Sequence, residues 1–320
     1  MKKLLLGIGL LPGLFTGLRA QNIVHPFELS WPIFQVKNSL YNRIEFIDSR
    51  SYTRSIGIVQ FGLSPGQEEN IVFKTPIEPQ LTGLIRALTD STAKDGVLVF
   101  QLRRFRFIET SGVRHCNLSA SLYVRKGEQY IPLAQLNTVM VLSSGIWQNL
   151  QSQGNSLITD LISKTLLQPA NDSLVYSIRD VQQIDSVEKK KLPLYTADHY
   201  TDGIYRNGEH FISQQPDWTR MEAQTKKDGS ITDVSAVYSN GTKKPVEKKE
   251  IYAIVYKGAP FIVTEYGFFP LQRLGDDFYS VCDLRVNRNK YHCQLMLDHQ
   301  KGEFIIVREL AGAESVMAPY

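Results

Sequence analysis

One serine lies in a pentapeptide that formally matches the nucleophile elbow of serine hydrolases. Residues 62–66 read Gly-Leu-Ser-Pro-Gly, with Ser64 at the position of the nucleophile. The elbow uses the backbone N–H of the following residue to stabilise an oxyanion, and here that residue is Pro65, which has no N–H. Because Ser-Pro and Pro-Gly pairs also mark turns, the segment is predicted to be a loop. A serine hydrolase acting through Ser64 is therefore the weakest of three functional hypotheses.

Four potential metal ligands lie close together further along the chain, at Asp198, His199, Asp202 and His210. Their spacing matches no established ligand pattern, and the segment is rich in residues that occupy turns. The sequence also contains no glycine-rich phosphate loop and no CxxC motif. We therefore predict no catalytic residue, no metal site and no cofactor, and expect a protein that is not an enzyme.

Two cysteines flank a polar turn between segments that have the alternating pattern of strands. If the loop consists of Asn287 and Arg288, Cys282 and Cys293 lie directly opposite each other, and an oxidising compartment would allow a cross-strand disulfide. Such bridges are geometrically strained, and a turn two residues longer would offset the two thiols. The pattern leaves a disulfide and two free thiols open. Cys116 stands alone and is expected to be a buried thiol.

Charged and aromatic side chains offer two further candidate surfaces. Arg103, Arg104 and Arg106 share one predicted strand with Phe105 and Phe107, so alternation is expected to divide their charge between two faces, on an exposed sheet surface. Aromatic residues crowd the segment 195–310. Most are expected to be core residues, while a partly exposed subset, with Trp218 and Tyr256 as candidates, would bind a glycan or a peptide.

The first twenty residues have the layout of a secretory signal: Lys2 and Lys3, an apolar run over 4–18, and Ala20 before the expected cleavage site. The run is shorter than the roughly 20 apolar residues that span a membrane, so no transmembrane segment is expected in the mature chain. No cysteine follows Ala20, so no lipid anchor is expected. The predicted location is the periplasm or the outside of the cell.

Removal of the signal also changes the charge of the protein. The full chain has 36 basic and 32 acidic residues, and three of the basic residues lie in the first twenty. The mature chain then has 33 basic against 32 acidic residues, a net charge of +1. A balance this close to neutral gives no electrostatic reason to expect a nucleic-acid partner.

The periodicity predicts an α+β fold. An N-terminal α/β sandwich has an antiparallel sheet and two helices, the first with an apolar stripe at Leu81, Leu84, Ile85 and Leu88. A mostly β domain with frequent turns follows. The predicted segments are a signal peptide (1–20), an N-terminal extension (21–37), the α+β domain (38–167), a linker with a short helix and a solvated lysine run (168–194), the β domain (195–310) and a tail (311–320).

Two resemblances accompany this division. Residues 44–50 (Ile-Glu-Phe-Ile-Asp-Ser-Arg), Ile56-Gly57 and residues 96–107 make the first domain resemble the auxiliary-lipoprotein domain found with envelope ABC transporters and outer-membrane assembly factors of Gram-negative bacteria. Asp202-Gly203-Ile204-Tyr205, Phe211, Pro216 and residues 251–269 make the second resemble an uncharacterised domain of secreted proteins from the same bacteria. Those relatives of the first domain are usually lipid-anchored. Neither resemblance implies a catalytic residue.

These observations favour a non-enzymatic secreted protein of the cell envelope that binds another envelope component. The alternative is a glycan- or peptide-binding module that uses the aromatic residues of the second domain. Exposure of Trp218 or Tyr256 beside a groove would favour the alternative.

Overall fold

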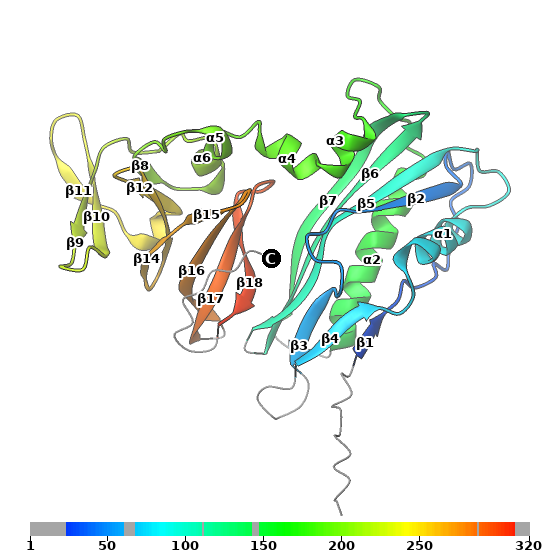
Figure 1. Cartoon of the computed structure of the whole chain (residues 1–320), viewed down its shortest axis with the longest axis horizontal. Coiled ribbons are helices and arrows are strands. Elements are labelled where there is room, and N and C mark those ends of the chain that lie inside the picture. Colours follow the sequence, from blue (N-terminus) through cyan, green and yellow to red (C-terminus); the bar gives the residue numbers. More distant parts are fainter. Residues whose placement is uncertain (1–23, 61–67, 111, 143–146, 287, 311–320) are drawn as a thin grey trace, which may run out of the picture.

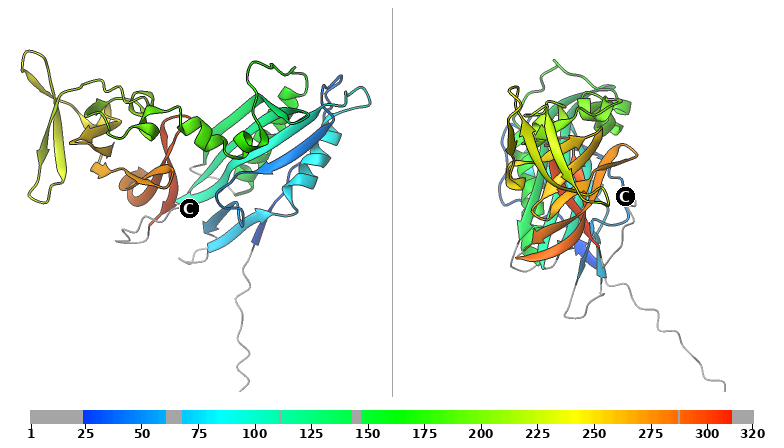
Figure 2. Two further views of the ribbon diagram at one scale, coloured as in Figure 1. Left: turned by 45° about the horizontal axis from the view of Figure 1, so that its top comes forward. Right: turned by 90° about the vertical axis from the view of Figure 1, so that its left-hand side faces the viewer.

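The computed structural model describes residues 24–60, 68–110, 112–142, 147–286 and 288–310. Strands dominate its mixture of helices and strands, so the fold is α+β, as predicted. A seven-stranded sheet with its helices forms one end of the molecule, and three smaller sheets form the other (Figures 1 and 2). None of the helices in these ranges is both long enough and apolar enough to cross a membrane.

The large sheet is mixed rather than antiparallel. Its three long strands, β5, β6 and β7, form the predicted antiparallel meander, but β2 and β3 both pair with β5 in parallel, and β1 pairs with β4 in parallel. The strands are β1 (Val24–Phe27), β2 (Arg43–Asp48), β3 (Gly57–Gln60), β4 (Glu68–Phe73), β5 (Val97–Thr110), β6 (Val113–Lys126) and β7 (Gln129–Leu142).

Strand β1 lies within the segment predicted as an N-terminal extension (21–37). Val24 pairs with Asn70 and Phe27 with Phe73, so residues 24–27 form an edge of the large sheet. Phe27 is 1% exposed, and its ring centroid lies 5.0 Å from that of Phe105 in the core. A four-residue strand with a distant partner carries too little periodicity to be recognised from the sequence.

Helices α1 (Ile77–Leu88) and α2 (Trp147–Thr165) cover one face of the large sheet (Figure 1). The predicted stripe of α1 is the buried one, with its four residues at most 1% exposed: Leu81, Leu84, Ile85 and Leu88. These side chains and those of α2 pack on Phe100, Phe105 and Phe107 of the sheet in a single core. The periodicity therefore predicted the helical layer correctly because it reflects burial.

The opposite face of the sheet is covered by the segment predicted as a linker. The sequence predicted a single helix there. The structure has two short helices, α3 (Ile178–Gln182) and α4 (Ile184–Lys189), which meet at Gln183. Ser177 begins α3 with a capping box, and Val181 is fully buried against Val99, Tyr123 and Tyr130. The segment is thus packed onto the first domain before the chain enters the second.

The rest of the chain forms the predicted β-rich region. Its sheets have the orders β11-β10-β9, β14-β13-β12-β8 and β15-β16-β17-β18. Their elements are α5 (Pro193–Thr196), β8 (Gly203–Tyr205), α6 (Gly208–Ile212), β9 (Met221–Thr225), β10 (Ile231–Val237), β11 (Lys243–Pro245), η1 (Lys248–Glu250), β12 (Ala253–Tyr256), β13 (Ala259–Thr264), β14 (Gly267–Pro270), β15 (Gln272–Leu274), β16 (Asp277–Val286), β17 (Asn289–Asp298) and β18 (Glu303–Glu309).

The hairpin of β16 and β17 has the short loop that places the two cysteines opposite each other. Val286 pairs with Asn289, and Cys282 pairs directly with Cys293. Both cysteines are buried and free in the structure. Burial raises the pKa of the Cys293 thiol to about 12 and raises the pKa of Cys282 as well. Of the two registers that the sequence left open, the structure has the one that places the cysteines directly opposite each other, with both as free thiols.

Burial of the cysteines predicts that the native protein is inert to thiol reagents. Cys116, Cys282 and Cys293 are all buried with raised pKa values, so little thiolate is present and none is accessible near pH 8. We expect no reaction with a chromogenic disulfide reagent over minutes, and reaction of all three thiols after unfolding without a reductant. Rapid labelling of the native protein would contradict the burial, and a single thiol after unfolding would show that Cys282 and Cys293 are bonded.

Candidate functional site

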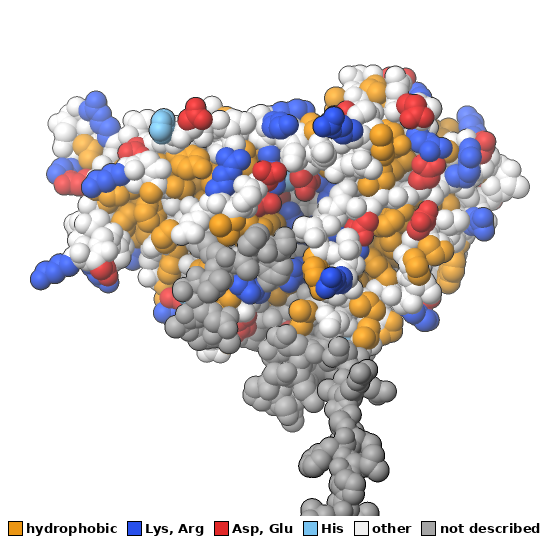
Figure 3. Space-filling model, viewed as in Figure 1, with side chains coloured by type: hydrophobic (Ala, Val, Ile, Leu, Met, Phe, Trp, Pro, Cys, Tyr) orange, Lys and Arg blue, Asp and Glu red, His pale blue; other side chains and the backbone are white. Residues whose placement is uncertain are grey.

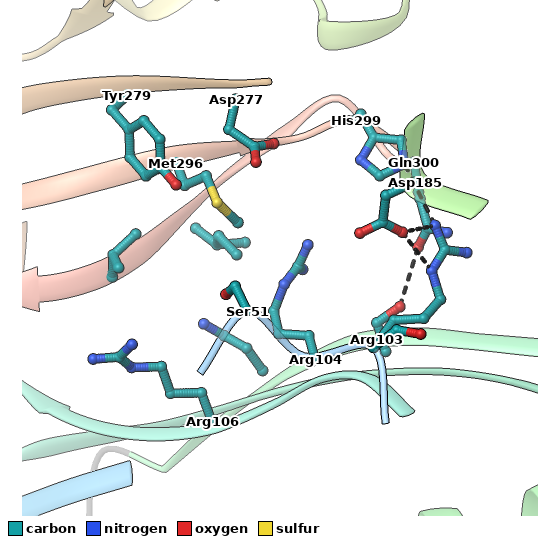
Figure 4. A pocket seen from close by; sticks show the side chains of 15 residues that line it. Ser51, Arg103, Arg104, Arg106, Asp185, Asp277, Tyr279, Met296, His299 and Gln300 are labelled. Atoms are coloured by element: carbon teal, nitrogen blue, oxygen red, sulfur yellow. Dashed lines mark hydrogen bonds and ion pairs between the residues drawn. The ribbon is translucent and has the colours of Figure 1, made fainter. Parts of the chain in front are cut away.

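A hollow of about 180 Å³ lies between the large sheet and the sheet of β15–β18. Its floor comes from β5 and β6 and its roof from β16, β17 and β18 (Figure 4). Among the direct hydrogen bonds that cross from floor to roof, the Asn117 side chain donates to the carbonyl of Ile306 (3.3 Å), and the Ser119 hydroxyl donates to Gln300 (3.3 Å). We call this hollow the cleft.

A β-bulge in β5 fills the cleft with arginine side chains. Leu102 pairs with Ala120 and Arg104 with Ser119, so Arg103 is an extra residue without a partner on β6. The bulge shifts the alternation, so Arg103, Arg104 and Arg106 all line the cleft while Phe105 stays in the core. The expectation that the three arginines divide between two exposed faces was wrong because a bulge is not visible in the pattern of residue types.

Arg103 is buried and binds two carboxylates of α4. Its side chain is 3% exposed; its Nε donates to Asp185 (2.7 Å), and its Nη2 donates to Glu188 (2.5 Å). Burial acts to raise the pKa of Glu188, but hydrogen bonds from His299 (3.0 Å) and Arg103 outweigh it and hold the pKa at about 2. The Glu188 carboxylate therefore remains ionised, and the hydrogen bonds of Arg103 to Asp185 and Glu188 fix α4 over the sheet.

The buried carboxylate of Asp298 pairs with Arg104. The Asp298 side chain is 1% exposed and accepts hydrogen bonds from Arg104 (3.3 Å), Asn137 (2.7 Å) and the backbone N–H of Gln300 (3.0 Å). Burial alone would raise the pKa of Asp298, but the charge of Arg104 and the amide of Asn137 lower it. The end of β17 is thereby tied to both β5 and β7.

Lys189 makes the third ion pair across this interface. Its ammonium group lies 2.6 Å from Asp277, and the residue is buried. The sequence placed Lys189 in a solvated run, which is wrong for this residue. Lys190 and Lys191 beside it are exposed, as expected. Of these three lysines, Lys189 thus belongs to the interface, whereas Lys190 and Lys191 are exposed.

Ion pairing in the cleft leaves little room for metal binding or acid–base chemistry. Asp185, Glu188 and His299 present potential ligand atoms within 4.8 Å of one another, but the Arg103 guanidinium already occupies the space between the carboxylates. A metal ion would have to displace that cation. The Glu188 carboxylate, held ionised by Arg103, is also poorly suited to accept a proton.

The potential ligands named from the sequence have structural roles instead. The Asp202 carboxylate accepts the backbone N–H groups of Lys257 (3.2 Å) and Gly258 (2.8 Å) and closes a turn. The His210 ring pairs with Asp217 (3.0 Å). Among the described residues, the one cluster whose ligand atoms lie close enough to hold a metal ion is that of Asp185, Glu188 and His299, which includes none of these four. Ser64 lies outside the described residues.

The side chains of Trp218 and Tyr256 are half-buried rather than exposed on the surface. Both rings pack against a hydrophobic cluster that includes Ile204 and Ile254. A cation lies over each ring, Arg206 at 5.6 Å from Trp218 and Lys257 at 5.1 Å from Tyr256. These contacts give the two aromatics a structural role and do not provide the open platform that a glycan would need.

The lowered pKa of Glu188 predicts a loss of stability in acid. The unfolded pKa is near 4.5 and the folded one about 2, so this carboxylate stabilises the fold above pH 5, and the contribution is lost as the pH falls toward 2. We expect Glu188→Gln to remove on the order of 2 kcal/mol of pH-dependent unfolding free energy over that range. Chemical denaturation at several pH values measures this difference.

Glu45→Gln is the matched control, because Glu45 pairs with Arg125 on the exposed surface. Its stability profile is expected to run parallel to that of the wild type. A Glu188→Gln profile that also runs parallel from pH 6 to pH 2 contradicts the role assigned to the buried pair.

Comparisons with known proteins give little beyond this geometry. No family model matches the chain, and no curated protein matches it. One of the solved structures that match is that of a DUF330 protein from Xanthomonas campestris. It is 12% identical to this chain, with a TM-score of 0.31, and the match covers 51% of this chain and 98% of that protein. Similarity at this level carries no inference about function.

Proposed function

We propose that this protein acts outside the cytoplasm as a non-enzymatic binding protein that docks onto another protein of the cell envelope. The signal-like first twenty residues and the two resemblances to envelope and secreted domains support the compartment. Ion pairing of the carboxylates and basic groups in the cleft argues against catalysis there. The observation that carries the proposal is an exposed apolar segment between β1 and β2.

We call this segment, residues 31–34 (Trp-Pro-Ile-Phe), the apolar ridge. Trp31 is 65% exposed, Ile33 is fully exposed and Phe34 is 47% exposed. Three large apolar side chains within four residues are costly to expose to water and are typical of a surface that binds a partner. Tryptophan is also among the residues that most often dominate the binding energy at protein interfaces.

Helix α1 supports the ridge from beneath. A Cβ atom on Gly83 would lie 2.3 Å from the Trp31 ring, so the ring rests directly on the helix and would have to shift if residue 83 had a side chain. Pro32 further restricts the backbone of the ridge. The ridge is thus presented on a rigid helix and sheet, which lowers the entropy lost when a partner binds.

The charge of the surface fits a protein partner. On the face shown in Figure 3, basic and acidic side chains are interspersed with hydrophobic ones. The mature chain has 33 basic and 32 acidic residues, so it has no general attraction to polyanions. A glycan-binding role for Trp218 and Tyr256 has less support, because both rings are half-buried against the core.

A photo-crosslinking amino acid at position 33 tests the proposal directly. Ile33 has no burial to lose, so the substitution should leave stability within about 0.5 kcal/mol of the wild type. In envelopes of the producing cell we expect one defined protein adduct from position 33. The same amino acid at Tyr238, which is 40% exposed in the distant β-rich region, is the control and should not give this adduct.

Two unlabelled variants then test whether the ridge itself binds the captured protein. Ile33→Asp places a charge in the contact and should weaken binding of the purified partner at least tenfold, with an unchanged melting temperature. Gly83→Ala leaves the ridge residues intact but displaces the Trp31 ring, and should weaken binding less. Equal affinity of wild type and Ile33→Asp, or identical adducts from positions 33 and 238, would refute docking through the ridge.

A further inference from the structure

A smaller hollow of about 50 Å³ adjoins the cleft and is lined mainly by cationic and hydroxyl side chains. Ser51, Arg103, Arg104 and Arg106 line both hollows, so the two share a floor. Arg50, Tyr52 and Ser55 complete the small one on the polar side. Among the described residues that line it, none is acidic. The small hollow is therefore a place where an anion would meet donors without meeting a carboxylate.

Arg50 supplies the strongest sign that a ligand belongs there. Its side chain is 6% exposed and forms a two-pronged ion pair with Asp48, through Nε (2.8 Å) and Nη2 (2.7 Å). The remaining nitrogen, Nη1, is buried and has no hydrogen-bond partner. A buried guanidinium nitrogen without an acceptor is rare in folded proteins, because the lost hydration is not replaced. An oxyanion in the small hollow would bring an acceptor to this region.

Arg104 offers further donors from the same floor. It rises from β5 into the cleft close to Ser51 (Figure 4). Its contact with Asp298 is long, at 3.3 Å, and uses one of the five N–H groups of a guanidinium. Asp298 also has Asn137 and the Gln300 backbone as donors. Arg104 can therefore bind a second oxyanion without leaving Asp298 unpaired.

The roof of the cleft combines apolar side chains with Asp277, whose carboxylate is already paired with Lys189 (2.6 Å). Tyr279 and Met296 line it in Figure 4, and Ile305 and Val307 line it from β18. Arginine on one wall and apolar side chains on the other suit a molecule with one charged end. A methionine adapts its shape to such a ligand more readily than a branched side chain does.

We propose that the small hollow and the adjoining cleft together bind a small amphiphilic anion, with a carboxylate or phosphate head between Arg50, Arg104 and Ser51 and a short apolar body in the cleft against Tyr279 and Met296. The bidentate geometry of guanidinium suits either head group. The site is independent of the apolar ridge, so the failure of one proposal does not affect the other.

Calorimetric titration of the full mature chain with probes that have a six-carbon alkyl body tests the site. Heptanoate and hexyl phosphate carry the two head groups on the same hexyl body, and the tighter binder identifies the preferred head. Hexanol lacks the charge and inorganic phosphate lacks the body, so both should bind at least tenfold more weakly than the better probe. No binding of either amphiphile up to about 10 mM, or equal binding of hexanol, overturns the proposal.

Two variants and one control locate the binding. Arg104→Gln removes the charge, and Ser51→Trp fills the shared floor from an exposed position without breaking an ion pair. Each should weaken the better probe at least tenfold, and the second remains informative if the first is poorly folded. Arg125→Gln removes an exposed arginine of the same sheet and should bind like the wild type. Wild-type affinity in Ser51→Trp would also overturn the proposal.

Discussion

The buried guanidinium of Arg103 is the constraint on which the arrangement of this molecule depends. It lies on the face of the large sheet opposite the helices and binds Asp185 and Glu188 of α4, next to His299 at the end of β17. A buried cation needs close anionic partners, because its hydration has been lost. The position of α4, and with it the start of the β-rich region, is thus tied to one residue of β5.

Ion pairs of this kind determine orientation more than they add stability. The cost of removing both charges from water offsets much of the attraction within a buried ion pair. An apolar contact of similar size would therefore stabilise the fold to the same extent. Directed hydrogen bonds, however, are lost after small displacements, whereas apolar contacts tolerate sliding. The pairs of Arg103, Arg104 and Lys189 each link the large sheet or α4 to another segment. The same long side chains pack less densely than aliphatic ones, which accounts for a hollow in the middle of the interface.

Sequence patterns predicted what depends on local periodicity. The stripe of α1 is set by neighbouring residues and was correct, and the register of the cysteine hairpin is one of the two that the sequence left open. The bulge at Arg103 and the parallel pairing of β1 were missed because they depend on partners far along the chain. The bulge places the arginines in the cleft, so the cleft was missed as well. The residue types alone do not reveal the cleft, because an arginine on an exposed strand and an arginine in a bulge look the same in the sequence.

The parallel pairing of β1 also bears on the order in which the chain can fold. Phe27 of β1 cannot be covered until Phe73 of β4 is in place, and β2 cannot pair until β5 is present. In contrast, β16, β17 and β18 pair with their immediate neighbours in the sequence. Closing long loops is slower than closing hairpins, because more chain entropy is lost before the first contact forms. The hairpins of β16, β17 and β18 can therefore form without any distant segment, whereas β1 stays unpaired until β4 is present.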